Sequence, residues 1–214
     1  DLLRRLVRVG LPASGENALF SGGFVIYTAL AAGLGTVVLA AQRITFNALA
    51  FSFMIGMAFQ LSVGALVGQA LGRGDPDGAR QVTRQTVLLT TLAMGAVSLV
   101  LFLFPGPIIR AFTPEEEIIE IGTTALRIIA VSQPLGAPGL VWSGAMRGAG
   151  DTRWVMWSTA VTMWLVRLPV SYLGGYVLNL GLDGIYLGNL ADLAVRTIWS
   201  WLRYRQGKWE RIKV

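Results

Sequence analysis

The residues of this sequence that could do chemistry are a few carboxylates and amides within long apolar segments: Glu16, Asn47, Gln60, Gln133 and Asp192. A polar or charged side chain is costly in hydrocarbon, so each of them should face protein or water. Together they could bind a cation, a proton or a polar solute along a pathway through a membrane. The chain has no His and no Cys, which excludes imidazole and thiolate metal ligands and the Ser-His and Cys-His nucleophile pairs.

The two carboxylates admit both a structural and a functional interpretation. Glu16 either pairs with Arg8 or another arginine near the membrane surface, or takes part in cation or proton handling. Asp192 precedes Arg196 by four residues, the favourable orientation for an ion pair within one helix. The alternative for Asp192 is an ion-coupling site. Arg167 is close enough to the outer end of its segment that we expect its side chain to extend to the outer membrane surface.

Gln60 lies within a row of glycines at a spacing of four residues: Gly56, Gly64, Gly68 and Gly72. Small residues at this period let another helix backbone approach closely, which predicts that the glycines serve helix packing. Gln60 is the one polar member of the row. Because an unpaired amide near the middle of a membrane is unfavourable, Gln60 either finds a packing partner or contacts a substrate.

Two prolines predict a weak point in one long apolar segment. Pro134 and Pro138 flank Gly136 and directly follow Gln133, and each proline removes a backbone hydrogen bond from a helix. We therefore expect the carbonyl group of Ala130 to be released, and that of Pro134 likewise. Interrupted membrane helices line binding sites in transporters. The stretch is thus either a hinge that lines such a site or a kink that improves packing.

These residues belong to six apolar segments, each long enough to cross a hydrocarbon layer of about 30 Å as a helix. The composition agrees, because 54% of the 214 residues are hydrophobic and only 14% are charged, and 26 are glycines. The predicted spans are residues 12–34, 39–71, 82–104, 118–146, 152–178 and 184–203. The sequence therefore predicts an all-α membrane protein with six transmembrane helices.

The basic residues predict the orientation of these spans. Outside the spans, Lys and Arg gather in both terminal regions and in the connections that follow the second and fourth spans, and Arg110 is the exception. Basic connections stay in the cytoplasm, so both ends are predicted to be cytoplasmic. The net charge of +6 is spread along one membrane face, which argues against nucleic acid as a partner.

Two of these basic connections share a Gly-x-Gly-Asp corner, one ending at Asp75 and one at Asp151. Glycine commonly ends a helix and Asp is a strong N-cap, so each corner predicts a tight helical hairpin capped by its aspartate. The shared pattern suggests two related hairpins. It also resembles the motif of intramembrane aspartyl proteases, but that chemistry needs two carboxyl groups within hydrogen-bonding range. Because capping explains both aspartates, we do not expect an enzyme.

Five motifs in order carry a resemblance to a known family. They are Leu11-Pro12 with Glu16-Asn17; Gly33-Leu34-Gly35 with Ala40-Ala41-Gln42-Arg43-Ile44; Val67-Gly68-Gln69-Ala70-Leu71-Gly72 with Gly74-Asp75-Pro76; Met146-Arg147-Gly148-Ala149-Gly150-Asp151-Thr152-Arg153; and Val166-Arg167-Leu168-Pro169. In this order the chain resembles, nearly from end to end, the C-terminal six-helix lobe of multidrug and toxic compound extrusion (MATE) transporters.

The resemblance implies one half of a two-lobed carrier of twelve helices, with the N-terminal lobe missing from this sequence. Such a carrier exchanges small organic, often cationic compounds for H⁺ or Na⁺ by alternating access, without a cofactor. We expect a multi-pass protein of a prokaryotic cell membrane, with the lipid bilayer and the other lobe as partners. The lobe would rock as a nearly rigid body, flexing between residues 133 and 139, while Asn47, Gln60 and Gln133 line the cavity.

Departures from the family pattern favour one branch. The acidic residues expected in the NorM-like subfamily would stand at Phe20 and Gly136, and Gln42 stands where members often have His. The chain therefore resembles the DinF-like branch, in which the coupling carboxylates belong to the N-terminal lobe. Two alternatives stay open: a flippase of lipid-linked sugars from the same superfamily, and a non-transporting half that acts as an assembly or regulatory subunit.

Overall fold

The computed structural model describes residues 2–211 of the chain, and the side chains of residues 14–209. Over this range the structure is helical and contains no β-strand, which confirms the all-α class. The long helices are α1 (Leu2–Gly33), α2 (Thr36–Gly72), α3 (Pro76–Leu103), α5 (Glu116–Gly148) and α8 (Gly181–Arg205), with a short helix α4 (Pro105–Arg110) before α5. A short 3₁₀-helix, η3 (Lys208–Arg211), follows α8.

Residues 152–177 form one helical stretch in which α and π turns alternate. It consists of α6 (Thr152–Val161), the π-helix η1 (Thr162–Arg167), α7 (Leu168–Tyr172) and the π-helix η2 (Leu173–Val177). At the end of η1, the amide of Leu168 donates to the carbonyl of Met163, five residues back. Such wide turns occur often at functional sites, because the extra residue rotates the side chains around it.

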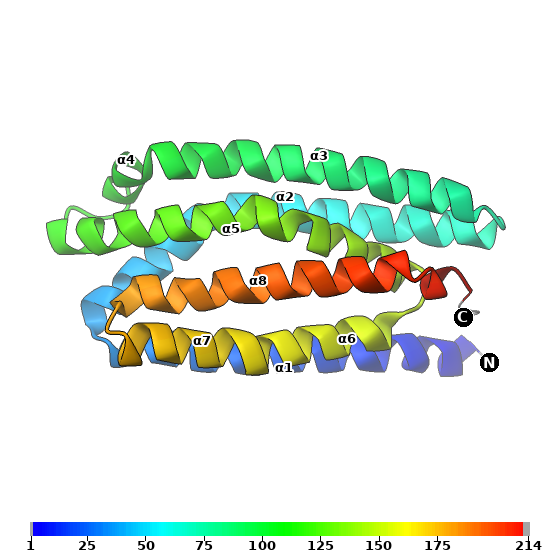
Figure 1. Cartoon of the computed structure of the whole chain (residues 1–214), viewed down its shortest axis with the longest axis horizontal. Coiled ribbons are helices and arrows are strands. Elements are labelled where there is room, and N and C mark those ends of the chain that lie inside the picture. The colour runs from blue at the N-terminus through cyan, green and yellow to red at the C-terminus, as the bar shows by residue number, and fades with distance from the viewer. Residues whose placement is uncertain (1, 212–214) are drawn as a thin grey trace.

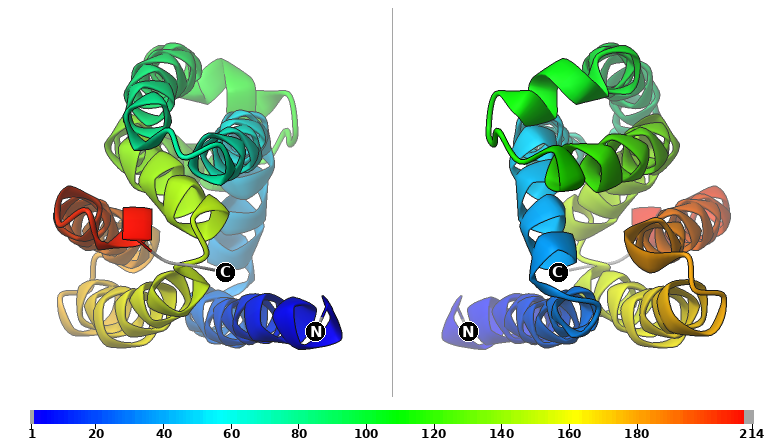
Figure 2. Two further views of the ribbon diagram at one scale, coloured as in Figure 1. Left: turned by 90° about the vertical axis from the view of Figure 1, so that its right-hand side faces the viewer. Right: turned by 90° about the vertical axis from the view of Figure 1, so that its left-hand side faces the viewer.

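The helices run roughly parallel to one long axis (Figure 1). The start of α1, the end of α8 and the α2–α3 and α5–α6 connections all lie at one end, and the α1–α2 connection and α4 lie at the other. Seen along this axis, α2, α3 and α5 form one group, and α1, α8 and the stretch from α6 to η2 form a second (Figure 2). The connections that the basic residues predict on one side thus meet at one end, which we call the basic end. Its cytoplasmic location stays a prediction.

The surface of the described helices is strongly apolar. Phe51, Leu61 and Leu165 are 71%, 68% and 70% exposed. Among the described helices, α2, α3 and α5 are long and apolar enough to cross a membrane, judged by length and composition. These features fit a lipid environment, in which apolar side chains face outward. The crossing of the membrane by all six segments stays a prediction.

The two Gly-x-Gly-Asp corners share one backbone geometry. Gly74 and Gly150 both adopt a positive φ, of 74° and 88°. The amide of Asp75 donates to the carbonyl five residues back at 3.0 Å, and the amide of Asp151 does the same at 2.8 Å. This closure is typical of helix ends that glycine terminates. The predicted tight hairpins are confirmed, and their common geometry supports the idea of two related hairpins.

The two aspartates of these corners nevertheless differ in their partners. Asp75 caps α3 as predicted, because its Oδ1 accepts a hydrogen bond from the amide of Gly78 at 2.8 Å. Asp151 makes no such capping bond. Its carboxylate instead pairs with Arg203 of α8, with Nη2 and Oδ2 2.8 Å apart. The predicted cap at Asp151 is therefore wrong, since a charged hydrogen bond to a guanidinium is stronger than one to an amide.

The glycines of α2 pack against glycines of α5, as the spacing predicts. A Cβ atom on Gly148 would lie 2.0 Å from the carbonyl oxygen of Gly64. One on Gly144 would lie 2.4 Å from the carbonyl oxygen of Gln60. Only glycine allows backbones to approach this closely. The packing role of the glycine row is therefore confirmed for its central members.

Candidate functional site

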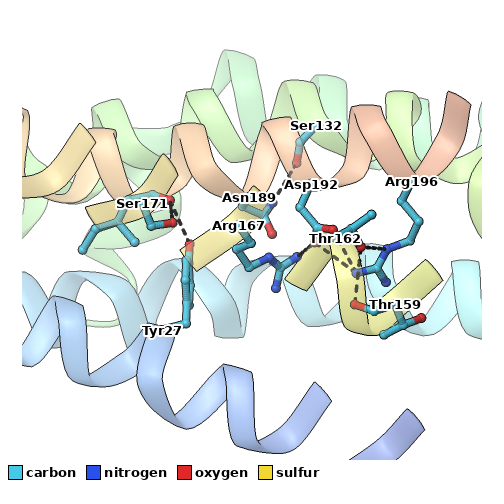
Figure 3. Close-up of polar contacts among 10 residues, drawn as sticks. Tyr27, Ser132, Thr159, Thr162, Arg167, Ser171, Asn189, Asp192 and Arg196 are labelled. Atoms are coloured by element: carbon cyan, nitrogen blue, oxygen red, sulfur yellow. Dashed lines mark hydrogen bonds and ion pairs between the residues drawn. The ribbon is translucent and has the colours of Figure 1, made fainter. Parts of the chain in front are cut away.

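The centre of the polar interior is Asp192 of α8, which has no solvent-exposed side-chain surface (Figure 3). Its Oδ2 lies 2.7 Å from Nη2 of Arg167, and its Oδ1 lies 3.0 Å from Nη2 of Arg196. The predicted pair between Asp192 and Arg196 is confirmed. The predicted position of Arg167 at the outer membrane surface is wrong. The π-helix η1 turns this side chain inward, where it is 7% exposed. There it faces the buried carboxylate of Asp192, whose negative charge needs a positive partner.

Aromatic rings of α1 cover the other side of Arg167. The guanidinium carbon lies 5.5 Å from the ring centre of Tyr27 and 6.0 Å from that of Phe20, within the range of cation–π attraction. Nε of Arg167 has no hydrogen-bond partner among the described residues. The cluster thus contains two guanidinium groups and one carboxylate, and ring faces stabilise the excess positive charge. A loss of the charge on Asp192 would leave two buried cations without compensation.

A chain of polar contacts leads from this cluster towards the basic end. Nε of Arg196 donates to Oγ1 of Thr162 at 3.2 Å, and this hydroxyl lies 3.5 Å from the carbonyl of Thr159 (Figure 3). Oγ1 of Thr159 donates to Oε1 of Glu16 at 2.9 Å. Nη2 of Arg147 pairs with the same oxygen at 2.5 Å. The chain connects α8, η1, α6, α1 and α5, so it ties the two groups of helices together.

Glu16 is therefore paired with an arginine, as one of its two interpretations requires. The partner is Arg147 at the end of α5; the side chain of Arg8 lies outside the described side chains. Glu16 is 9% exposed. Glu16 and Asp192, the two deep carboxylates, are thus both paired with arginines. The described residues contain no group of three His, Cys, Asp or Glu side chains that could hold a metal ion.

The three predicted cavity-lining amides lie in different surroundings. Asn47 is exposed on α2, and Gln133 is buried in α5 at 8% exposure. Next to Gln133, Oγ of Ser132 accepts a hydrogen bond from Asn189 of α8 at 3.4 Å (Figure 3). Gln60 lines a groove at the basic end, which Arg147 also lines. The structure does not bring the three amides into that groove together.

The proline stretch of α5 is kinked but not interrupted. The helix continues from Glu116 to Gly148 with Pro134 and Pro138 inside it, and its ribbon turns away from α3 in the second half (Figure 1). The carbonyl of Ala130 is released, as predicted, and accepts a hydrogen bond from Oγ of Ser98 on α3 at 2.5 Å. The continuous helix fits the kink interpretation, and Ser98 of the neighbouring helix satisfies the freed carbonyl of Ala130. The hinge motion itself stays a prediction.

Two contributions to the polar interior were absent from the sequence predictions. Thr159 and Thr162 connect Glu16 to the Asp192 cluster. Their spacing of three residues places both hydroxyls on one helix face, a signal present in the sequence. The inward position of Arg167 has no such local signal, because it depends on the π turns before Pro169 and on a carboxylate from another helix.

The chain that holds this site matches a protein family and several curated relatives. The MatE family matches residues 12–173 of the chain. A probable multidrug resistance protein NorM of Thermotoga maritima is 34% identical over 97% of this chain and 45% of its own length. An uncharacterized transporter, YisQ, of Bacillus subtilis is 27% identical over 97% of this chain and 46% of its own length. The chain thus spans about half the length of the curated relatives that it matches.

Solved structures show the same fold. A multidrug resistance MATE family transporter of the MOP superfamily in an outward-facing conformation superposes with a TM-score of 0.89 at 17% identity, over 98% of this chain and 47% of the other. A Vibrio cholerae MATE transporter, VcmN, superposes with a TM-score of 0.87 at 22% identity, over 94% and 46%. At these identities the likeness shows the fold alone. The predicted DinF-like branch is not confirmed, since several of the relatives carry the name NorM.

Proposed function

Since this chain belongs to the MatE family, we infer that it forms one lobe of a two-lobed membrane carrier that expels organic compounds. The observation that carries the proposal is the family match over residues 12–173 together with a fold equal to about half of known MATE transporters. The relatives are transporters and not enzymes, and the chain is likewise not an enzyme. Transport would be driven by exchange for H⁺ or Na⁺.

The polar interior supports a lobe that moves as one body. The contacts from Asp192 through Thr162 and Glu16 to Arg147 cross-link helices of both groups. Cross-linked helices rock together more readily than they slide, so alternating access would come from motion of the whole lobe against its partner lobe. Flexing would be confined to the stretch around Pro134 and Pro138.

The coupling carboxylates would lie in the other lobe. Asp192 is engaged by two guanidinium groups and Glu16 by one guanidinium and one hydroxyl. A carboxylate that binds and releases a coupling ion needs a charge that can change at low cost, and Asp192 lacks that property. The engagement of both carboxylates supports the DinF-like arrangement. Independently of it, the basic connections favour a lobe with both ends in the cytoplasm and six membrane crossings. Gln60, Asn47 and Gln133 remain candidates for substrate contacts.

The test is transport by the two-lobed carrier that contains this chain. The carrier is reconstituted in vesicles loaded with ethidium, an organic cation, and a pH or Na⁺ gradient is imposed. Ethidium efflux should accelerate with one of the two gradients. When an ionophore collapses that gradient, the efflux rate should return to that of ethidium-loaded vesicles without protein. The proposal would be overturned if neither gradient changed ethidium efflux and its rate equalled that of loaded vesicles without protein. The reported relatives carry multidrug resistance or transporter names, so no observation favours the flippase or the non-transporting half.

A further inference from the structure

After α8, the chain turns back at the basic end and buries a tryptophan side chain (Figure 1). Gly207 adopts a positive φ of 66°, and its amide donates to the carbonyl of Tyr204 at 3.1 Å. This geometry ends α8 and reverses the chain. Trp209 of η3 is 0% exposed, and its Nε1 donates to the same carbonyl at 2.9 Å. Because this bond satisfies the single polar atom of the indole, the ring can be buried without an unpaired donor.

Trp209 links the end of α8 to the half of α5 that follows its prolines. The ring of Tyr204 stacks with that of Trp209 at a centre-to-centre distance of 4.9 Å and with that of Trp142 on α5 at 6.4 Å. Both distances lie within the range of favourable aromatic pairs. Trp209 also belongs to one buried apolar cluster with Val141 and Met146 of α5 and with residues of α2 and α3. The indole therefore stabilises the second half of α5 where it packs against its neighbours.

The second half of α5, residues 139–148, depends on such contacts with other helices. Pro134 and Pro138 lie inside α5, and each removes a backbone hydrogen bond that would join the two halves of the helix. The end of α5 has one further tie to α8, because Arg203 pairs with Asp151 in the α5–α6 connection, with Nη2 and Oδ2 2.8 Å apart. These ties start from the last turn of α8 and from η3, so one segment controls how firmly the second half of α5 is held.

From these contacts we propose that residues 207–209 form a strap that holds the second half of α5 in place at the basic end. Flexing of α5 at its prolines then requires Trp209 to leave the apolar cluster, because that cluster joins the part of α5 that would move to α2 and α3. The strap thus sets the free-energy cost of the flexing, and in this respect the inference rests on the proposed function. The indole is fully covered by this chain, so the strap does not depend on what packs against the outer surface of the lobe.

The test is hydrogen–deuterium exchange of the two-lobed carrier that contains this chain, followed by mass spectrometry of peptides from the two halves of α5. Amide exchange in a native protein reports the free energy of local opening. In Trp209→Ala we expect residues 139–148 to exchange at least about tenfold faster than in the wild type, while residues 119–129 change by less than about twofold. Trp201→Ala is the matched control, because Trp201 also lies on α8 but is 40% exposed. Both halves of α5 should keep their wild-type exchange rates in this control.

Two further variants separate the strap from a general loss of packing. Trp209→Phe keeps an aromatic ring in the cluster, so residues 139–148 should exchange within about threefold of the wild-type rate. Gly207→Val keeps the indole but disfavours the turn, because a β-branched residue rarely adopts a positive φ. It should accelerate exchange in residues 139–148 as Trp209→Ala does, and it carries the test where Trp209→Ala does not fold.

The link to the prolines is tested by adding Trp209→Ala to a carrier with Pro134→Ala and Pro138→Ala. In that background the backbone hydrogen bonds of α5 hold residues 139–148, so loss of the strap should accelerate their exchange by less than about threefold. Three results would overturn the inference: unchanged exchange in Trp209→Ala, equal acceleration in both halves of α5, and equal acceleration with and without the prolines. Because exchange is read without substrate or ion gradient, failure here leaves the efflux proposal untouched, and loss of efflux leaves this one.

Discussion

Asp192 of α8 lies 2.7 Å from Arg167 of η1, and the two side chains are 0% and 7% exposed. This ion pair joins two helices in the interior of the lobe, and Arg196 adds a second guanidinium to the same carboxylate. The cluster therefore carries one excess positive charge, which faces the rings of Tyr27 and Phe20. Its energetic balance depends on the one carboxylate.

Asp192→Asn should strongly destabilise the carrier. The substitution leaves two buried guanidinium groups without a negative charge, which costs about 3–5 kcal/mol for comparable buried pairs. We expect a clear fall in the midpoint of thermal unfolding, measured by differential scanning fluorimetry. Asp77→Asn is the matched control, because Asp77 is 91% exposed. In the protein that does fold, an altered pH or Na⁺ dependence of transport would contradict the structural role and assign Asp192 to coupling.

Arg167→Met should cost less stability than Asp192→Asn. Removing Arg167 also removes the excess positive charge and leaves Asp192 balanced by Arg196, while the cation–π contacts with α1 are lost. The expected loss is about 1–2 kcal/mol, the size of a desolvated cation–π interaction. The measurement is the same thermal unfolding series. A larger loss than for Asp192→Asn would show that Arg167, and not the carboxylate, holds the cluster together.

Gly148→Ala should separate α2 from α5. The added methyl group would lie 2.0 Å from the carbonyl oxygen of Gly64, and the backbones must move apart to admit it. Overpacking of this kind costs about 1–3 kcal/mol. Gly72→Ala is the control, because a Cβ at Gly72 meets no atom within 4 Å. If both variants unfold at the same temperature, the close contact between the two glycines does not stabilise the lobe.

Pro134→Ala combined with Pro138→Ala should slow transport with little effect on folding. Alanine restores backbone donors to α5, so the helix becomes straighter and stiffer where the lobe is proposed to flex. Pro107→Ala, in the short helix α4, is the control. The readout is the efflux rate in vesicles together with drug affinity. Unchanged values for both would exclude a hinge in this stretch and leave the prolines with a packing role.

The sequence by itself determined the helical architecture and its local contacts. Apolar length and the glycine corners predict helices that turn at Gly74 and Gly150, because a positive φ at a helix end is a local requirement. The pair between Asp192 and Arg196 is equally local, since a separation of four residues brings both side chains to one helix face. The glycine row of α2 announced its close packing in the same way.

Only the tertiary structure decided which distant partners the charged residues choose. Asp75 and Asp151 lie in equivalent corners, yet the carboxylate of Asp151 does not cap its helix. It pairs instead with Arg203, 2.8 Å away. Arg167 lies inside the lobe because η1 turns it towards Asp192, and Glu16 finds Arg147 at the end of α5. In each case a strong charged contact competes with a weaker local one. The partner of each charged side chain therefore depends on which helix packs beside it. Residue spacing within one helix cannot specify that neighbour.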